Sequence, residues 1–182
     1  MIRCPIPLLG FCAWSGTGKT TLLKAVIPML RKEGLRVAVV KHAHHDFDLD
    51  QPGKDSWELR KAGALQTLVA SRRRIALIEE REAPADNEEP TLAELLEMLD
   101  PRRLDLVLVE GFKNEVFPKI ELHRPSLGRP LLCGQRRHII AVASDKPVSL
   151  PRPLPQLDLN RPDELVDFIL DFCNDEALKL SL

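Results

Sequence analysis

Apolar residues along the chain gather in short runs whose continuity predicts strands buried on both faces of a parallel sheet. These runs cover residues 7–13, 35–40, 104–109 and 138–143. Apolar residues with helical spacing follow the first run from Leu22 to Leu30, and a similar stripe extends from Leu165 to Phe172. Strands that alternate with helices in this way indicate an α/β fold, in which helices flank a mostly parallel sheet.

Two further segments predict strands of a different kind. Residues 66–70 and 75–80 are expected to pair as a β-hairpin around a turn at residues 71–74, which contains three consecutive arginines. These arginines are most simply solvated, and contact with a phosphate or a partner is the alternative. Residues 118–123 alternate between polar and apolar side chains, as in a strand with one face in water. We expect one domain over residues 1–182, with a hairpin extension at about residues 66–80.

The composition excludes several classes of protein. The chain has 182 residues, of which 26 are basic and 27 acidic, and the net charge of −1 lacks the basic excess of a nucleic-acid binder. No apolar run approaches the roughly 20 residues that a membrane-spanning helix needs. The four cysteines lie far apart and form no C-x-x-C pair, which is typical of reduced thiols in the cytoplasm. We expect a cytoplasmic protein without a nucleic-acid or membrane partner.

The turn after the first apolar run has the pattern of a phosphate-binding loop of the Walker A type, although Ala13 replaces its first glycine. Gly16 and Gly18 allow backbone N–H groups to turn inward around an anion, and the following helix directs the positive end of its dipole to the same point. Lys19 supplies a cation for the terminal phosphates, and the Thr20 hydroxyl is a ligand for Mg²⁺. The residues expected to bind the nucleotide here are Ser15, Gly16, Thr17, Gly18, Lys19, Thr20 and Thr21.

Further polar residues follow the other apolar runs, and the carboxyl ends of parallel strands meet at one edge of a sheet. Glu110 ends the run at residues 104–109, where a Walker B acid would hold Mg²⁺ directly or through water. With Lys19, it is the expected catalytic pair. Asp145 follows the last run and is placed to accept hydrogen bonds from guanine. The full N-K-x-D guanine signature is absent, so the residues themselves favour guanine only mildly.

The segment at residues 41–56 is rich in histidine and aspartate. Among Asp46, Asp48, Asp50 and Asp55, we expect Asp55 to be the second carboxylate near the metal, because it opens a helix beside Ser56. The expected metal ligands are therefore Thr20, Asp55 and Glu110. The histidines His42, His44 and His45 could bind a transition metal. Contact with phosphate or water is the preferred interpretation, since no cysteine joins the cluster, and His42 is expected beside the nucleotide.

The motifs AWSGTGKTT, VVKHAHHDFDLDQPGKDS, LDLVLVEGFK and IIAVASD resemble those of the molybdopterin-guanine dinucleotide biosynthesis protein B (MobB) family. The resemblance extends over about residues 7–172. It implies binding and weak hydrolysis of GTP with Mg²⁺, in support of a molybdopterin guanylyltransferase (MobA-type) that joins GMP to molybdopterin. Molybdopterin is a further candidate ligand. The resemblance also implies a homodimer, with the hairpin at residues 66–80 and the strand at residues 118–123 contributing to the contact.

Two other functions stay open. The end of the strand at Glu110 and Gly111 is also similar to dethiobiotin synthetase, which allows a small-molecule kinase or ligase with Lys41, His42 and Lys113 around the acceptor. A metal-insertion GTPase would instead hold nickel or zinc on the three histidines of residues 42–45. No residue marks an efficient catalytic base or an arginine finger, so hydrolysis is expected at roughly 10⁻⁴ to 10⁻² per second.

Overall fold

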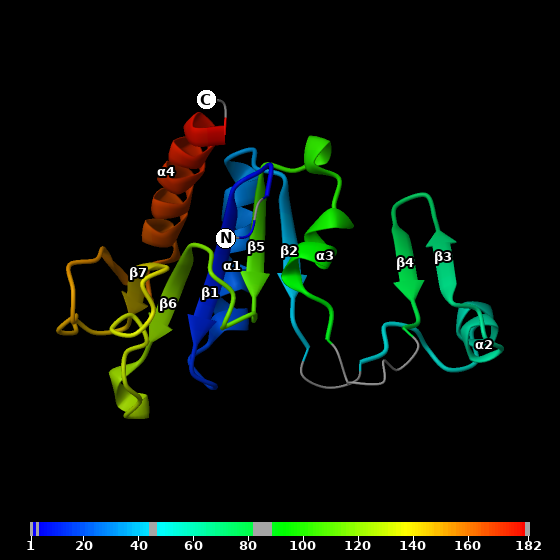
Figure 1. The fold of residues 1–182 in the computed structure, drawn as a ribbon, viewed down its shortest axis with the longest axis horizontal. Helices are drawn as coiled ribbons and strands as arrows, with labels where there is room; N and C mark the ends of the chain where they lie inside the picture. Colours follow the sequence, from blue (N-terminus) through cyan, green and yellow to red (C-terminus); the bar gives the residue numbers. More distant parts are fainter. Residues whose placement is uncertain (1, 3, 44–46, 82–88, 181–182) are drawn as a thin grey trace. The chain divides into compact units, whose positions relative to one another are not determined.

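The computed structural model describes residues 2, 4–43, 47–81 and 89–180, and the side chains of residues 177–180 are left out of the description. The chain forms two units, which are described separately. Met1–His42 and Thr91–Leu182 make the first unit, and Ala43–Pro90 make the second. The first unit contains a six-stranded parallel sheet, and the second contains one helix and a hairpin (Figure 1).

The sheet of the first unit has the strand order β2-β5-β1-β6-β7-β8, and every neighbouring pair is parallel. Its strands are β1 (Leu8–Ala13), β2 (Val37–Lys41), β5 (Leu106–Glu110), β6 (Lys119–His123), β7 (Ile139–Ser144) and β8 (Gln156–Asp158). The four apolar runs of the sequence form β1, β2, β5 and β7, which confirms the predicted α/β fold with a mostly parallel sheet. The carboxyl ends of all four strands consequently lie at the same edge.

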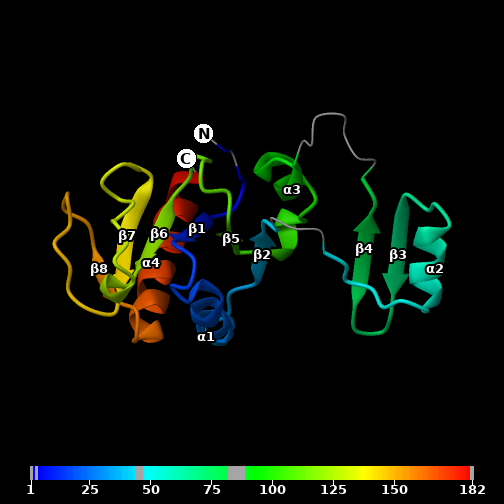
Figure 2. The same cartoon turned by 90° about the horizontal axis from the view of Figure 1, so that it is seen from below.

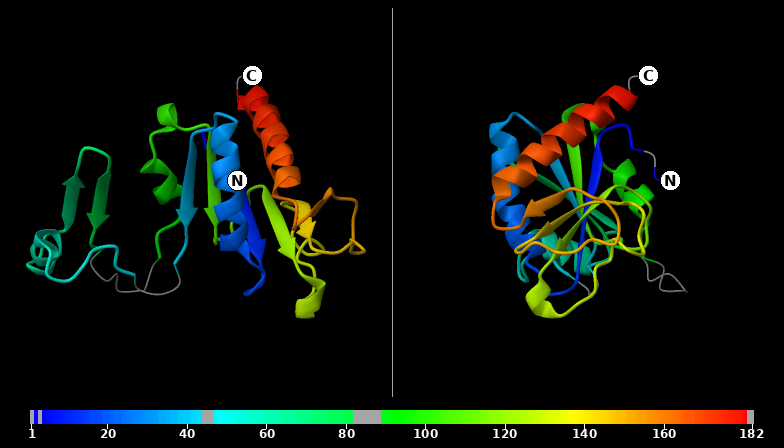
Figure 3. Two further views of the ribbon diagram at one scale, coloured as in Figure 1. Left: turned by 180° about the vertical axis from the view of Figure 1, so that it is seen from behind. Right: turned by 90° about the vertical axis from the view of Figure 1, so that its left-hand side faces the viewer.

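Helices and loops cover both faces of this sheet. The helices are α1 (Lys19–Lys32), α3 (Leu92–Glu97) and α4 (Pro162–Leu180), and short 3₁₀ turns occur at Pro101–Arg103 and Pro125–Leu127. α1 and α4 share one face of the sheet and one apolar core, and α3 packs on the opposite face (Figure 2, Figure 3). Thr91 and Glu94 form a capping box at the start of α3, with both reciprocal hydrogen bonds present.

β6 differs from its sequence prediction. The alternation at residues 118–123 predicted a wet face, and this is wrong: all five residues of β6 are buried, and the strand lies between β1 and β7. Glu121 accepts hydrogen bonds from the backbone N–H groups of Leu132 and Cys133 at 2.7 and 2.8 Å. Lys119 donates to backbone carbonyls after β5. The polar side chains thus hold the loops that cover this face, and β6 has no free edge to offer another subunit.

The second unit confirms the predicted hairpin. β3 (Gln66–Ala70) and β4 (Ile75–Glu79) pair antiparallel, and the arginines of the turn are exposed. α2 (Asp55–Lys61) precedes the hairpin and carries Trp57, over whose ring the Lys61 Nζ lies at 5.7 Å from the centroid. The register places Leu68, Ile75 and Leu77 on one face of the hairpin, and all three side chains are exposed.

All four cysteines are free thiols, and Cys12, Cys133 and Cys173 are buried. Burial is the main cause that raises the pKa of Cys12, to about 12, and that of Cys173, to about 11. In the part of the chain that the structure describes, no helix has both the length and the apolar character needed to cross a membrane.

Candidate functional site

The loop between β1 and α1 has the backbone geometry that its glycines predict. Gly16 and Gly18 have φ angles of +81° and +97°, in the left-handed region that side chains disfavour. Gly18 is the N-cap residue of α1, and the loop closes on itself through a 2.7 Å hydrogen bond from the Thr17 hydroxyl to the Trp14 carbonyl. The backbone therefore delivers the unpaired N–H groups of a helix N-terminus to the end of β1, which suits an anion.

Lys19 begins α1 at this point and is half-buried. Within the described residues its side chain makes no hydrogen bond or ion pair, so the ammonium is available to a ligand at the loop. Ser15, Thr20 and Thr21 are exposed beside it. The roles of these residues in binding a nucleotide and a metal ion stay predictions from the sequence.

Glu110 ends β5 at the same edge of the sheet. In the strand register it is opposite Phe11 of β1 and Lys41 of β2, so it lies one strand away from the phosphate loop. Its carboxylate makes no hydrogen bond or ion pair with any described residue. Carboxylate and hydroxyl oxygens suit Mg²⁺, which keeps several waters and needs few protein ligands. Glu110 and Thr20 therefore offer the kind of oxygen ligands that a magnesium ion prefers.

His42 follows β2 and packs closely on the turn after Glu110. Its backbone N–H donates to the Glu110 carbonyl at 2.9 Å, and its ring stacks on Phe112 with the centroids 4.7 Å apart. Gly111 has a φ angle of +107°, and a Cβ there would lie 2.5 Å from the His42 Cβ, so only glycine fits. The structure thus brings His42 and Glu110 to one edge, as predicted.

Asp145 follows β7 at this edge, but its carboxylate pairs with a residue that the sequence interpretation missed. Its Oδ2 accepts a hydrogen bond from Nη1 of Arg124 at 2.7 Å. Nε of Arg124 donates in turn to the Thr17 carbonyl of the phosphate loop at 2.9 Å. Asp145 Oδ1 is buried and has no hydrogen-bond partner among the described residues. The sequence could have pointed to Arg124 through its position directly after β6. The wrong prediction that one face of this strand lies in water hid that position.

A second missed contact ties the phosphate loop to the segment after β6. The indole N–H of Trp14 donates to the Pro130 carbonyl at 2.9 Å. The Arg129 guanidinium lies over the indole, 5.6 Å from the ring centroid. The loop is consequently held from outside at both Trp14 and Thr17.

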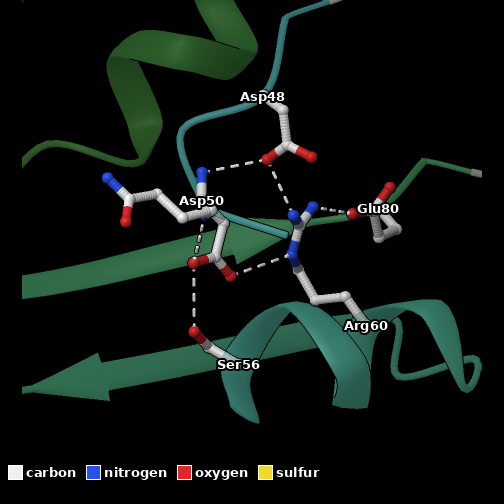
Figure 4. Close-up of polar contacts among 6 residues, drawn as sticks. Asp48, Asp50, Ser56, Arg60 and Glu80 are labelled. Carbon is white, nitrogen blue, oxygen red and sulfur yellow. Dashed lines mark hydrogen bonds and ion pairs between the residues drawn. The ribbon is translucent and has the colours of Figure 1, made fainter. Parts of the chain in front are cut away.

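The second unit contains most of the histidine- and aspartate-rich segment at residues 41–56. In this unit the Arg60 side chain contacts three carboxylates (Figure 4). The Arg60 side chain is only 5% exposed and contacts Asp48 at 2.7 Å, Asp50 at 3.6 Å and Glu80. Asp50 also accepts a hydrogen bond from the Ser56 hydroxyl at 3.1 Å. The backbone N–H of Asp50, followed by the Arg60 guanidinium, lowers the pKa of Asp48. Asp48 and Asp50 therefore have structural partners of their own.

Asp55 is the first residue of α2 in this second unit. The sequence also offered Asp46, His44 and His45 as candidates, and these three residues lie outside the described part of the chain. Among the residues that are described, no group of three or more histidine, cysteine, aspartate or glutamate side chains is placed to hold a metal ion.

Comparison with known proteins gives a consistent result. The family MobB, described as molybdopterin guanine dinucleotide synthesis protein B, matches residues 8–145. A molybdopterin-guanine dinucleotide biosynthesis adapter protein of Escherichia coli (strain K12) is 54% identical over 168 residues, covering 92% of this chain and 93% of that protein. A protein of the same description from Haemophilus influenzae is 43% identical, over 90% of this chain and 88% of its own length. A crystal structure of molybdopterin-guanine biosynthesis protein B aligns with a TM-score of 0.70 and 28% identity, over 92% of this chain and 99% of that one. As its motifs predicted, the chain belongs to the molybdopterin guanine dinucleotide synthesis protein B family.

Proposed function

We propose that this protein binds GTP with Mg²⁺ at the phosphate loop and hydrolyses it slowly. The observation that carries the proposal is the loop, in which two left-handed glycines lead into α1 with Lys19 at its first position. This geometry gathers backbone N–H groups, a helix N-terminus and a cation at one point, which suits a polyphosphate. The choice of guanine follows from the family resemblance.

In the proposed complex, Lys19 neutralises charge on the β- and γ-phosphates, and the backbone N–H groups of residues 16–20 bind their oxygens. Thr20 and Glu110 organise Mg²⁺, which is supported by the exposure of Thr20 beside the loop and by the unengaged Glu110 carboxylate one strand away. Asp55, in the second unit, stays a candidate second carboxylate on the ground of the sequence alone. His42 lies at the same edge as a further nucleotide contact.

We propose that the bound nucleotide serves an adapter role in the cytoplasm. Two relatives carry the description of molybdopterin-guanine dinucleotide biosynthesis adapter protein. The partner would be a molybdopterin guanylyltransferase, which joins GMP to molybdopterin, and molybdopterin itself is a further candidate ligand. Turnover on the order of 10⁻⁴ to 10⁻² per second fits a protein that holds a nucleotide while its partner acts. Four free thiols agree with a reducing compartment.

The decisive experiment is a calorimetric titration of the purified protein with GTP and with ATP in the presence of Mg²⁺. A tagged guanylyltransferase is then tested for capture of the protein with and without GTP. We expect tighter binding of GTP than of ATP and recovery of the complex. Absence of nucleotide binding, or turnover of tens per second by the protein alone, would contradict the proposal. A phosphorylated small molecule instead of free phosphate would favour a kinase.

We further propose a homodimer in which the hairpin contacts a second copy of the chain. The exposed apolar face formed by Leu68, Ile75 and Leu77 supports this, because a two-stranded hairpin with a bare apolar face is marginal by itself. Leu68→Glu and Ile75→Glu are expected to convert dimer to monomer in sedimentation velocity, whereas Arg72→Glu on the turn leaves the dimer intact. A dimer that survives both charged substitutions would place the contact elsewhere.

A further inference from the structure

Arg124 is the first residue after β6, and its guanidinium connects two parts of the sheet edge. Nε donates to the Thr17 carbonyl of the phosphate loop at 2.9 Å, and Nη1 donates to Asp145 after β7 at 2.7 Å. The Arg124 side chain is 33% exposed and that of Asp145 is 18% exposed, so the pair is only partly screened by water. One planar group therefore joins the loop backbone to a carboxylate on another strand.

The carbonyl oxygen that Arg124 contacts belongs to the peptide group between Thr17 and Gly18, inside the phosphate loop. The peptide bond between Thr17 and Gly18 is planar and trans, so its N–H points opposite to its carbonyl. A hydrogen bond that fixes the Thr17 carbonyl consequently also fixes the direction of the Gly18 N–H. A charged donor on the carbonyl polarises the peptide and strengthens that N–H as a donor to an anion.

The loop needs such a restraint, because glycine has broad backbone freedom. Gly16 and Gly18 both have left-handed backbone conformations. A Cβ on Gly16 would have no neighbouring atom within 4 Å, and a Cβ on Gly18 would have one, Nη2 of Arg124 at 3.9 Å. Side-chain packing at the glycines therefore does little to hold their conformation. Restraint from outside lowers the ordering cost that a ligand must otherwise overcome.

We propose that Arg124 and Asp145 form a brace, in which Asp145 orients Arg124 and Arg124 holds the phosphate loop in its anion-binding conformation. Both are positioning residues in this role. Asp145 then acts on affinity through the loop, whatever base the nucleotide carries. The inference rests on the proposed function, because it requires a polyphosphate at the loop.

A ligand without a base separates this role from recognition of guanine. We would measure the affinity of inorganic tripolyphosphate with Mg²⁺, and of GTP with Mg²⁺, for the full-length protein and for Arg124→Ala and Asp145→Asn. The brace predicts that each variant loses about tenfold in affinity for both ligands, the size expected for a charge-assisted hydrogen bond. If Asp145→Asn weakens GTP alone, Asp145 reads the base and the brace is wrong.

A double-mutant cycle tests whether the two residues act as a unit. Adding Asp145→Asn to Arg124→Ala should change the affinity for tripolyphosphate by less than about twofold, since the brace is already broken. Full additivity of the two losses would overturn the proposal. Arg124→Lys should keep part of the affinity, because one ammonium can reach the carbonyl or the carboxylate but lacks the fork that joins both.

Lys24→Ala is the matched control, because it removes an exposed positive charge from α1, the helix that follows the loop, and leaves the hydrogen bond to Thr17 in place. It should bind tripolyphosphate as the unmodified protein does, and an equal loss would reduce the effect to general charge. If the unmodified protein binds neither ligand, the proposed function itself fails. If it binds both and Arg124→Ala binds equally well, only the brace fails.

Discussion

The Nζ atom of Lys119, a residue that is fully buried, lies 2.6 Å from the backbone carbonyl oxygen of Glu115. It also donates to the carbonyl of Phe112 at 2.8 Å and lies 4.3 Å from the ring centroid of Phe117. One lysine of β6 thus holds the segment that follows Glu110 and Gly111. The backbone position of the loop that follows Glu110 therefore depends on this buried lysine.

Lys119 should make stability depend on pH in an unusual range. Burial is the main cause that lowers its pKa, from 10.5 to about 8. Between these two values the unfolded chain still holds a proton that the folded protein has released, so the free energy of unfolding rises with pH. Below about pH 8 both states are protonated and this contribution is constant. We expect Lys119→Met to lose stability, and the gap to the unmodified protein to widen above pH 8.

Urea unfolding at pH 7, 8, 9 and 10 measures this gap, since groups common to both proteins cancel in the difference. Lys146→Met, which changes an exposed lysine, supplies the baseline. A gap that stays constant or narrows above pH 8 would contradict the role given to Lys119.

Lys19→Ala should weaken GTP binding by roughly 10- to 100-fold, because charge-assisted hydrogen bonds to phosphate are lost. Slow hydrolysis should fall with it. Isothermal titration with GTP and Mg²⁺ measures the affinity. Lys24→Ala, which removes an exposed lysine from the same helix, should bind normally. Unchanged binding by Lys19→Ala would show that the loop is not the nucleotide site.

Glu110→Gln should separate hydrolysis from binding. The amide keeps the shape of the side chain but loses the charge that favours Mg²⁺, so turnover should fall on the order of 10- to 100-fold. Affinity for GTP should change much less, since Lys19 and the loop backbone are intact. Single-turnover phosphate release at several Mg²⁺ concentrations checks this, and recovery of the rate at high Mg²⁺ would locate the defect in metal binding. A variant with normal turnover at low Mg²⁺ would remove Glu110 from the metal site.

Arg60→Met should loosen the second unit locally. It would leave Asp48, Asp50 and Glu80 together without the cation that contacts all three. Hydrogen exchange should become faster in α2 and in the β3–β4 hairpin. Amides of the six-stranded sheet should keep their rates, because the three carboxylates that Arg60 contacts all belong to the second unit. Arg72→Met on the exposed turn is the control, and equal effects of both variants would deny Arg60 its central role.

Local patterns predicted much of the fold. The four apolar runs became buried parallel strands, and the hairpin formed as expected. The phosphate loop was also predictable, because the spacing of its glycines and Lys19 encodes a backbone conformation within a few residues. In each case the information lies inside one short segment.

The error at β6 shows where such patterns fail. Lys119 and Glu121 look like solvent-facing residues of an amphipathic strand, but their partners are backbone groups of the loops that precede and follow β6. Alternation with a period of two shows which side chains are polar, but it does not show whether water or a loop supplies their hydrogen bonds. The prediction that residues 118–123 form a strand with one face in water also hid Arg124. Its position beside the phosphate loop becomes evident only when β6 is a central strand that ends at the site.

The chain contains two tryptophans, and one belongs to each unit: Trp14 lies in the phosphate loop and Trp57 in α2. Fluorescence of a Trp57→Phe protein therefore reports only on the loop, and that of a Trp14→Phe protein only on the helix before the hairpin. Because the Trp14 indole is hydrogen-bonded to Pro130, its emission should respond when an anion tightens the loop. The two tryptophans therefore provide separate fluorescence probes, one for ligand binding at the phosphate loop and one for unfolding of the second unit.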